Sequence, residues 1–535
     1  QAAAAYLVAE APPVPQLMKW LQDWWEKEVL QCCITREGDK LETFHEVNKR
    51  PSYMPTPRPR VSTRSHVLDR EALITEHSST EKMARCYSIN RSENIGEGAF
   101  GTVKKARLKG SQMMRAIKEV PKKKKAKYQE AVRREIAILR TLDHPSICRL
   151  HETYENDRSI FMVMECIEGR ELFDEMDENI RMGRHNMERC AEIMHQVFSA
   201  LQYCHEREVL HRDLKPENIM VLNADSPLDR PRIKLIDFGL AVAFDPLEDE
   251  TSPDGSKSIS GCMLEGTSAY LAPEVWNSLT YSEASDMWST GIIIYVMFRG
   301  KFPAQGDHLH EIEELSEPTG RDLVSGLLNP DPHARLRAKE AREHPWITQY
   351  PNTSRTLPTD DFKKVTMSFL DFRKSNLVRQ AALTALASQT SGEQMESLRD
   401  SWNSMDTDGN GVITKAELLA AFEKAPPSGI TDVSQWVEDI FDELDSDGSG
   451  ELDFTEWEAA AMQSLTKISE EAMRAAFHVL DNDNSGTIGI EELKRIMPLV
   501  GNDELSTAME EVDLNKDGVI DFSEFSKMLT KAAGT

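Results

Sequence analysis

The stretch "DSDGSGELDFTE", residues 445–456, decides the fold of the last quarter of this chain. Oxygen-bearing side chains stand at its positions 1, 3 and 5, glycine at position 6, an apolar residue at position 8 and glutamate at position 12. A hard cation such as Ca²⁺ takes about six to eight oxygen ligands, and this spacing can supply them from one short loop. Gly450 permits the sharp turn, and Glu456 can bind an ion through both carboxylate oxygens.

Three further stretches repeat this plan: "DTDGNGVITKAE" (406–417), "DNDNSGTIGIEE" (481–492) and "DLNKDGVIDFSE" (513–524). Successive loops begin 39, 36 and 32 residues apart, which is too regular for chance Asp-rich turns, and helical segments flank each one. The pattern therefore predicts four EF-hands that pair into two lobes, the first with the second and the third with the fourth. The candidate calcium ligands are Asp406, Asp408, Asn410, Val412, Glu417, Asp445, Asp447, Ser449, Glu451, Glu456, Asp481, Asp483, Ser485, Thr487, Glu492, Asp513, Asn515, Asp517, Val519 and Glu524.

The four loops differ in ligand charge. Loops 445–456 and 513–524 carry acids at four liganding positions, whereas loops 406–417 and 481–492 carry acids at three. Because affinity rises with ligand charge, we expect each lobe to hold a stronger and a weaker site. Methionines on the flanking helices are either core filler or the lining of a groove that opens when calcium binds.

The charge of the chain is concentrated in these repeats. The net charge is −27 overall, and residues 396–535 contain 31 acidic and 10 basic residues, a net charge of −21. This balance argues against general nucleic-acid binding. A hydrophobic content of 40% fits a globular protein, and no apolar run approaches the roughly 18 residues of a membrane span. Eight scattered cysteines without metal-ligand spacing favour a reduced, cytoplasmic compartment.

A glycine-rich run, "IGEGAFGTV" (95–103), lies far upstream. The same G-x-G-x-x-G string occurs in dinucleotide folds, where a helix opens directly after the glycines. Here the alternating apolar residues and the following "RAIKEV" predict strand, tight turn and strand instead. Glycines let backbone amides approach phosphates, and Lys118 can neutralise them. Glu135, in a predicted helix over 128–142, could pair with Lys118.

Three further motifs follow in order: "VLHRDLKPENIMV" (209–221), "IKLIDFGLA" (233–241) and "GTSAYLAPEVW" (266–276). Together with the glycine-rich run, they resemble the protein-kinase family from about residue 88 to residue 347. The resemblance implies that Asp213 accepts or orients the substrate hydroxyl proton and that Lys215 stabilises the transferring phosphoryl group. It also implies that Asn218 and Asp237 hold Mg²⁺ ions.

The remaining kinase positions carry over by the same resemblance. The implied catalytic set is Asp213, Lys215, Lys118 and Glu135, and the implied ATP contacts are Ile95, Gly96, Gly98, Gly101, Val103, Ala116, Lys118, Met164, Glu165, Asn218 and Asp237. The "HRDLKPEN" string is similar to the serine/threonine type. Glu171 and Glu217 lie where basophilic kinases read an Arg upstream of the target, so protein substrates with Arg or Lys before the Ser or Thr are expected.

A kinase domain, a basic helical junction and four EF-hands in that order resemble the calcium-dependent protein kinases of plants and protists. The implied fold is α+β, a bilobal protein kinase fold followed by an all-α calmodulin-like domain of two EF-hand pairs. The implied cofactors are ATP, Mg²⁺ and Ca²⁺. The expected domains are an N-terminal extension (1–87), a kinase domain (88–347), an autoinhibitory junction (348–395) and four EF-hands (396–535).

The junction contains "NLVRQAALTALASQ" (376–389), which predicts an amphipathic helix whose apolar face comprises Leu377, Val378, Ala381, Ala382, Ala385 and Leu386. Basic residues make its approach positive: Lys363, Lys364, Arg373, Lys374 and Arg379. A calcium-opened acidic EF-hand lobe binds such a helix. The resemblance implies that this segment holds the kinase inactive at low calcium. The alternative is an inert linker helix.

Two stretches depart from the family pattern. The segment 301–337 is shorter than in other members, although Glu274, Asp286 and Arg335, which brace the lower lobe, remain. This departure raises an alternative function, a catalytically impaired calcium-sensing scaffold. The activation segment (245–266) is long. Its acids Asp245, Glu248, Asp249 and Glu250 could mimic phosphate opposite Arg212, or Ser258 and Ser260 could be phosphorylated.

The first 85 or so residues match no family pattern. Residues 16–33 predict an amphipathic helix with Trp20, Trp24 and Trp25, suited to docking on a domain or a membrane surface. Cys32 and Cys33 are either palmitoylation sites or ordinary reduced thiols, and residues 51–60 form a Pro-rich linker. We expect a cytoplasmic monomer, with peripheral membrane association as an option. The chain begins at Gln1, so an N-terminal acylation signal is not visible.

Overall fold

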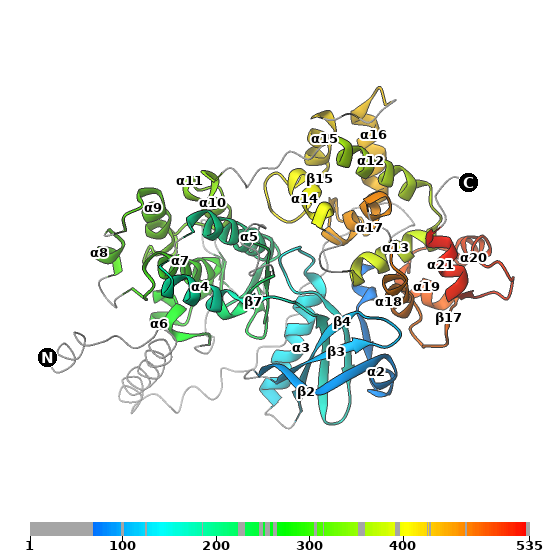
Figure 1. Cartoon of the computed structure of the whole chain (residues 1–535), viewed down its shortest axis with the longest axis horizontal. Coiled ribbons are helices and arrows are strands. Elements are labelled where there is room, and N and C mark those ends of the chain that lie inside the picture. Colours follow the sequence, from blue (N-terminus) through cyan, green and yellow to red (C-terminus); the bar gives the residue numbers. More distant parts are fainter. Residues whose placement is uncertain are drawn as a thin grey trace. The chain divides into compact units, whose positions relative to one another are not determined.

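The computed structural model divides the chain into two compact units (Figure 1). The first unit includes residues 168–353 and the second includes residues 56–167 and 354–535. The structure describes residues 68–97, 101–122, 126–183, 186–222, 231–244, 250–251, 257–259, 265–303, 308–313, 315–350, 359–390, 396–424, 426, 430–465 and 468–530. The predicted helix at 16–33, its two cysteines and the Pro-rich linker at 51–60 lie outside these residues.

The first unit is mainly helical. Its helices are α4 (Leu172–Arg181), α5 (Met187–Glu206), α6 (Pro273–Ser278), α7 (Glu283–Arg299), α8 (His308–Glu313), α9 (Pro318–Leu327), α10 (Ala338–Arg342) and α11 (Pro345–Thr348). Helix α7 is buried from Ser285 to Met297, as expected for a helix that is apolar all round. Short strands form three small sheets: β7 (Arg170–Glu171), β9 (Ile219–Val221) and β10 (Ile233–Leu235); β8 (Val209–Leu210) and β11 (Val242–Ala243); β12 (Glu250–Thr251), β13 (Lys257–Ile259) and β14 (Tyr281–Ser282).

The shortened stretch of the first unit still closes a core. Leu323, Val324 and Leu327 on α9 are fully buried. The guanidinium of Arg335 donates to both carboxylate oxygens of Glu274, at 2.7 and 3.0 Å, and its side chain is inaccessible to solvent. A buried bidentate pair of this kind needs good geometry to offset its desolvation cost. The lower lobe is therefore packed in spite of its short connection.

The second unit begins with a six-stranded sheet in the order β1-β5-β6-β4-β3-β2. Its strands are β1 (Thr75–His77), β2 (Tyr87–Glu97), β3 (Thr102–Leu108), β4 (Met114–Pro121), β5 (Leu150–Glu155) and β6 (Ser159–Glu165), and β1 pairs parallel with β5. Helix α3 (Ala126–Thr141) lies between β4 and β5 in the chain. A 3-10 helix, η2 (Arg70–Leu73), and helix α2 (Glu81–Cys86) precede β2. Part of the predicted extension 1–87 is thus folded onto this sheet.

The EF-hand region contains eight helices among the described residues: α14 (Glu396–Met405), α15 (Lys415–Lys424), α16 (Val433–Leu444), α17 (Phe454–Leu465), α18 (Glu470–Leu480), α19 (Ile490–Ile496), α20 (Asn502–Glu510) and α21 (Phe522–Thr530). Two short ladders join the loops, β15 (Ile413–Thr414) with β16 (Glu451–Leu452) and β17 (Thr487–Ile488) with β18 (Ile520–Asp521). The predicted pairing of the first loop with the second and the third with the fourth is confirmed.

The junction forms two helices, α12 (Thr359–Lys374) and α13 (Leu377–Gln389), separated at Ser375 and Asn376. The Asn376 side chain caps α13 by accepting a hydrogen bond from the Arg379 amide at 2.9 Å. Helix α13 was predicted to have one apolar face, but Leu383, Thr384 and Ala387 are buried too. The reason is that α13 packs against helices of both EF-hand pairs, including α17, α18 and α21 (Figure 1).

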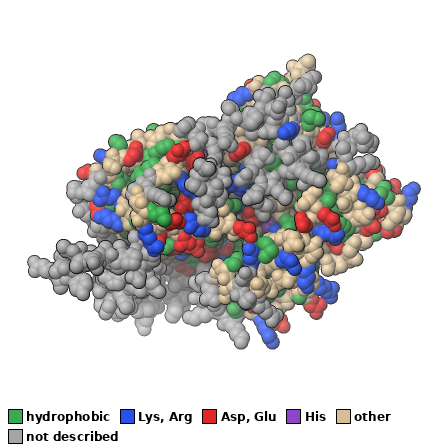
Figure 2. All heavy atoms as spheres, viewed as in Figure 1, with side chains coloured by type: hydrophobic (Ala, Val, Ile, Leu, Met, Phe, Trp, Pro, Cys, Tyr) green, Lys and Arg blue, Asp and Glu red, His purple; other side chains and the backbone are tan. Residues whose placement is uncertain are grey.

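No helix in the described ranges is long and apolar enough to cross a bilayer. On the face in Figure 2, acidic and basic side chains of the described residues are interspersed.

Candidate active site and calcium loops

The catalytic loop of the first unit gathers its predicted residues around Asp213. Lys215 Nζ donates to Asp213 Oδ2 at 2.8 Å, and Asn218 Nδ2 donates to the Asp213 carbonyl at 2.8 Å. Asp213 and Lys215 follow β8, and Asn218 ends the 3-10 helix η3 (Pro216–Asn218), which Pro216 starts. Because Asn218 uses its amide nitrogen here, its amide oxygen remains as a ligand for a hard cation such as Mg²⁺.

Thr267 completes this cluster, although no sequence motif predicted a role for it. Its backbone amide and its hydroxyl donate to Asp213 Oδ1 at 2.9 and 2.7 Å, and the hydroxyl accepts from Lys215 at 2.9 Å. The sequence feature that could have indicated this role is the threonine in the motif "GTSAYLAPEVW" (266–276). Asp213 is therefore oriented by a lysine, a hydroxyl and an amide of the chain itself.

The loop is anchored from α7 by Asp286. This carboxylate accepts from the His211 and Arg212 amides at 2.9 and 2.8 Å and lies 3.0 Å from His205 Nε2. Burial by itself would raise the pKa of Asp286, but the hydrogen bond and charge of His205 and the contacts with His211 hold it below its usual value. Arg212 adopts a left-handed backbone with φ 68°, which these contacts maintain.

Arg212 meets an acid that was not predicted. Its Nη2 lies 3.2 Å from Glu265 Oε2, and its guanidinium stacks over the Tyr281 ring, 4.0 Å from the centroid. Asp245, Glu248, Asp249 and Ser260 lie outside the described residues, whereas Ser258 pairs with Ser282 across strands β13 and β14. The side chain of Glu250, on β12, also lies outside the described residues, so Glu265 is the acid that the described side chains place opposite Arg212.

Asp237 follows β10 with an exposed side chain and a left-handed φ of 60°. Phe238 beside it is buried and packs on the His211 ring, with centroids 4.8 Å apart. The buried ring holds the backbone, so the neighbouring carboxylate points away from the core. An exposed carboxylate on an anchored turn fits the predicted Mg²⁺ ligand.

The sheet of the second unit holds the predicted lysine–glutamate pair. Lys118 Nζ lies 2.6 Å from Glu135 Oε1, and both residues are buried, with exposures of 7% and 2%. Gly96, Val103 and Lys118 stand in register across β2, β3 and β4. Helix α3 carries Glu135, so its position sets the geometry of the pair.

The other predicted nucleotide residues that the structure describes lie on the same sheet or at its edge. Ala116 stands opposite Met164 across β4 and β6, and the Ile95 side chain is 51% exposed. Gly101 has no room for a side chain, because a Cβ there would lie 2.1 Å from the Glu119 carbonyl oxygen. Gly98 lies outside the described residues.

Glu165 was also predicted to contact the nucleotide. Its side chain is buried and accepts a hydrogen bond from the Arg149 amide at 3.4 Å, and the Arg149 carbonyl accepts from the Glu165 amide at 2.9 Å. The side chain thus serves the pairing of β5 with β6. We therefore expect Glu165 to contact the nucleotide through its main chain and not through its side chain.

The first three calcium loops each gather three carboxylates within 4.8 Å of one another: Asp406, Asp408 and Glu417; Asp445, Asp447 and Glu456; Asp481, Asp483 and Glu492. The fourth loop has Asn515 at position 3, and its amide donates to Asp517 Oδ2 at 3.0 Å. The glycine at position 6 is left-handed in every loop, with φ between 81° and 88°. At position 7, the carbonyls of Glu451 and Thr487 accept from the serine at position 5 of the same loop and so turn inward.

The second loop shows the strongest electrostatic signature of a cation site. Glu456 is only 4% exposed, and its pKa is raised well above the usual value by burial and by its neighbours Asp447, Asp453 and Asp445. Burial and Asp447 also raise the pKa of Asp445 to about 6. Crowded carboxylates of this kind repel one another, and a divalent cation would relieve that repulsion. The residues therefore fit Ca²⁺.

Comparisons with known proteins agree with both sites. Residues 89–347 match the protein kinase domain family, and residues 395–462 and 470–530 match the EF-hand domain pair. Calcium-dependent protein kinase 3 of Plasmodium berghei is 33% identical over 478 residues, covering 84% of this chain and 81% of that protein. Calcium-dependent protein kinase 34 of Arabidopsis thaliana is 31% identical over 473 residues, covering 84% and 85%. Calcium-dependent protein kinase 5 of Plasmodium falciparum is 30% identical over 492 residues, covering 87% and 82%.

The fold and the two sites define a serine/threonine protein kinase joined to two EF-hand pairs. More particularly, the chain belongs to the calcium-dependent protein kinase family. Its cofactors are ATP and Mg²⁺ at the kinase residues and Ca²⁺ at the EF-hand loops. The predicted α+β kinase fold followed by an all-α EF-hand domain is confirmed. The scaffold alternative is not favoured, and the intact Asp213 cluster agrees with this conclusion.

Proposed function

We propose that the calcium-activated phosphorylation of proteins by this enzyme is controlled by the junction 348–395, which holds the kinase inactive at low calcium. The observation that carries the proposal is the burial of α13. Val378 is 1% exposed and Leu386 is fully buried, and they share one hydrophobic core with the EF-hand helices. If the EF-hands release α13, its apolar side chains would be exposed to water, so the helix has to pack against another surface.

The charge of the junction supports a second position for it on the catalytic unit. Arg373 forms an ion pair of 3.2 Å with Glu443 of the EF-hand region, and Arg379 donates to the Met528 carbonyl. On release, these cations would need acidic partners. Glu171 and Glu217 offer them. Burial raises the pKa of both carboxyls, and the neighbouring acids Asp174 and Glu217 add to the shift at Glu171.

Calcium would act by favouring the arrangement in which the EF-hands hold the junction. A ligand shifts such an equilibrium only by its differential affinity for the two states. Moving from 1% to 99% active takes about 5.5 kcal/mol, which several calcium sites together can supply.

Two altered proteins test autoinhibition. A chain truncated after Pro358 should phosphorylate a basic Ser/Thr peptide without calcium, and the double change Leu377→Asp with Leu386→Asp should weaken both the inhibition and its release. Leu499→Asp, at a residue that is 52% exposed, is the matched control. If the truncated kinase stays silent while the full chain with calcium is active, the junction activates instead and the proposal is wrong.

We also propose that the substrates carry Arg or Lys before the Ser or Thr. Glu217 Oε2 is buried and accepts no hydrogen bond from the described residues, which suits it to an incoming guanidinium. Changing Glu171 and Glu217 together to glutamine should raise KM for an Arg-containing peptide while leaving KM for ATP unchanged. An equal preference for Arg and Ala peptides in the unaltered enzyme would contradict this assignment.

The remaining proposals concern location and assembly. We expect a cytoplasmic monomer, in line with five cysteines that form no disulfide among the described residues, Cys86, Cys148, Cys166, Cys190 and Cys204. A second proposal is that residues 16–33 also bring the protein into peripheral contact with a membrane. Light scattering would test the monomer, and co-sedimentation with phosphatidylserine vesicles would test the membrane contact.

A further inference from the structure

A segment ahead of the kinase domain connects the EF-hands to the kinase sheet. We call residues 68–77 the strap; it contains η2 and β1 and precedes the family match that begins at residue 89. Two consecutive strap amides bind two different EF-hands. The Leu68 amide donates to the Ser446 carbonyl in the second calcium loop at 2.8 Å, and the Asp69 amide donates to the Ile496 carbonyl at the end of α19 at 2.7 Å.

Apolar side chains fix the strap in the same place. Leu68 and Leu73, with exposures of 5% and 2%, belong to the hydrophobic core that contains α13 and the EF-hand helices. Arg495 of α19 donates to the Ala72 carbonyl. The strap is therefore packed into the EF-hand region and does not merely lie on its surface.

The other side of the strap holds the end of α3. Arg70 Nη2 donates to the Arg140 carbonyl at 3.2 Å, and Arg140 Nη2 donates back to the Glu71 carbonyl at 3.3 Å. Arg140 also forms an ion pair with Glu76. These reciprocal contacts tie the last turn of α3 to the strap, while β1 adds to the edge of the sheet beside β5.

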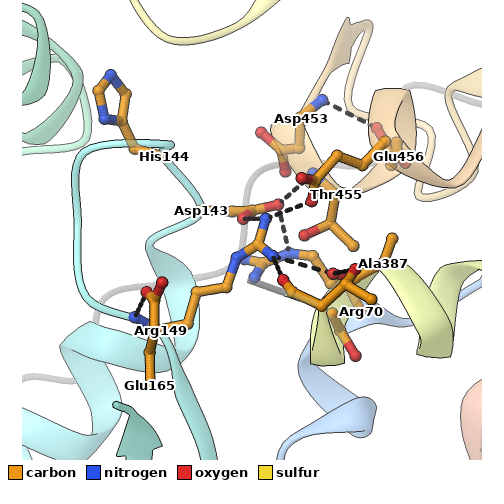
Figure 3. Close-up of polar contacts among 12 residues, drawn as sticks. Arg70, Asp143, His144, Arg149, Glu165, Ala387, Asp453, Thr455 and Glu456 are labelled. Carbon is orange, nitrogen blue, oxygen red and sulfur yellow. Dashed lines mark hydrogen bonds and ion pairs between the residues drawn. The ribbon is translucent and has the colours of Figure 1, made fainter. Parts of the chain in front are cut away.

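The turn after α3 is bound to the second calcium loop directly. Asp143 Oδ2 accepts from the Thr455 amide at 2.9 Å, and Thr455 immediately precedes the closing ligand Glu456 (Figure 3). Arg70 and Arg149 lie 3.8 and 3.7 Å from the Asp143 carboxylate. Burial by itself would raise the pKa of Asp143, but these two arginines and Thr455 keep it lowered.

Arg149 extends the contact to α17 and α13. It pairs with Glu458 at 2.8 Å. It also donates to the Ala387 carbonyl at 2.9 Å (Figure 3). A cavity of about 20 Å³, enough for about one ordered water molecule, lies where the strap, α3, β5, α13 and Thr455 meet. The strap thus lies where the kinase sheet, helix α13 and the EF-hands meet.

We propose that the strap is a positioning element that transmits the calcium-bound arrangement of the second and third EF-hands to α3 and so holds Glu135 against Lys118. The proposal rests on the calcium control proposed above. Arg140 lies five residues after Glu135, about 7.5 Å along the same rigid helix. A displacement of the strap therefore moves Glu135, whose 2.6 Å contact with Lys118 tolerates little movement.

Full-length variants test the strap. Arg70→Gln removes the contacts of the strap with Arg140 and Asp143. Leu68→Asp removes the apolar side chain that packs the strap into the EF-hand core. Arg70→Lys is the conservative variant. Arg85→Gln is the matched control, because Arg85 is exposed on α2 and pairs only loosely with Glu81, at 3.9 Å. The measurements are kcat and KM for a basic peptide at saturating calcium, the calcium-binding isotherm, and hydrogen exchange over residues 126–141.

We expect Arg70→Gln and Leu68→Asp to lower kcat at saturating calcium by about threefold to thirtyfold, with KM for the peptide and calcium stoichiometry unchanged. Calcium-induced protection of residues 126–141 should fall in both variants, recover in part in Arg70→Lys and remain in Arg85→Gln. Unchanged kcat and unchanged protection of residues 126–141 in both variants would overturn the proposal.

The exchange measurement separates this proposal from calcium control of activity. If the unaltered chain shows no activation by calcium, calcium control fails, but a loss of α3 protection in Arg70→Gln still supports the strap. If calcium activates every variant equally and α3 protection is equal throughout, calcium control survives and the strap proposal fails.

Discussion

The catalytic loop and the second calcium loop both place carboxylates within a short stretch of chain, yet they neutralise them differently. Asp213 is met by Lys215 and by the Thr267 hydroxyl, so the chain supplies its own partners. Glu456 is met by hydroxyl and amide donors from Ser446 and by other carboxylates. The catalytic loop therefore neutralises its carboxylate with its own side chains, whereas the calcium loop crowds carboxylates together in a way that suits a divalent cation.

The largest effect should come from the catalytic loop. Asp213→Ala should lower phosphotransfer by about a hundredfold or more at every calcium concentration, because general base and positioning effects are each of that order. Calcium binding should be unchanged, which isothermal titration can check. Asp322→Ala, at an exposed acid of the same unit, is the control. Calcium-dependent activity that persists in Asp213→Ala would show that another residue orients the substrate.

The calcium loops should respond in proportion to their charge. Glu456→Gln should raise the calcium concentration for half-activation by about tenfold, since ligand charge and number set affinity over several decades. Glu417→Gln, in the less charged loop of the same pair, should raise it less. Activity titrations over buffered calcium would compare them, and an equal or larger shift in Glu417→Gln would reject the ranking. The sequence makes the same prediction for Glu524→Gln over Glu492→Gln.

A third carboxylate, Glu152, is neutralised by a partner from far along the chain. His478 Nε2 of α18 lies 3.1 Å from Glu152 Oε1 in the sheet, and Tyr87, Tyr154 and Cys86 surround the pair. Burial would lower the pKa of His478, but Glu152 raises it from 6.5 to about 10. Burial would raise the pKa of Glu152, but His478 and the hydrogen bonds keep it lowered.

The sign of the pH dependence follows from these shifts. The stabilisation through His478 is complete below pH 6.5 and is lost as the pH rises toward about 10, whereas that of Glu152 is lost as the pH falls below its unfolded value of 4.5. At saturating calcium, Tm should therefore fall between pH 6.5 and pH 9, and His478→Gln should flatten that slope. Scanning calorimetry of both proteins tests this, and parallel slopes would contradict the role of the pair.

The smallest effect should come from a purely local contact. Asn376→Ala removes the cap of α13 and should lower the free energy of unfolding of the second unit by about 1 kcal/mol. Chemical denaturation at saturating calcium measures this change. Asn376→Ser should retain most of the stability, because serine also caps helices well. A loss as large in Asn376→Ser as in Asn376→Ala would mean that contacts of Asn376 with Glu511 matter more than the cap.

The calcium loops and the catalytic motifs could be predicted from the sequence, because their functional residues lie close together in the chain. Each calcium loop contains all of its own side-chain ligands within twelve residues, and Asp213, Lys215 and Asn218 lie within six. Their spacing alone dictates which groups can meet, because a short chain has few ways to turn. The helix over 376–389 was predictable from local sequence as well, because its apolar residues recur at helical spacing.

Tertiary structure decided the contacts that join these parts. Thr267 is 54 residues from Asp213, and Thr455 is 312 residues from Asp143. No periodicity links such partners, because a hydrogen bond or ion pair leaves no pattern in the intervening sequence. The full burial of α13 and the place of the strap depend likewise on helices that only the folded chain brings together. The sequence by itself therefore determined the chemistry of each site, and folding determined which sites are mechanically connected.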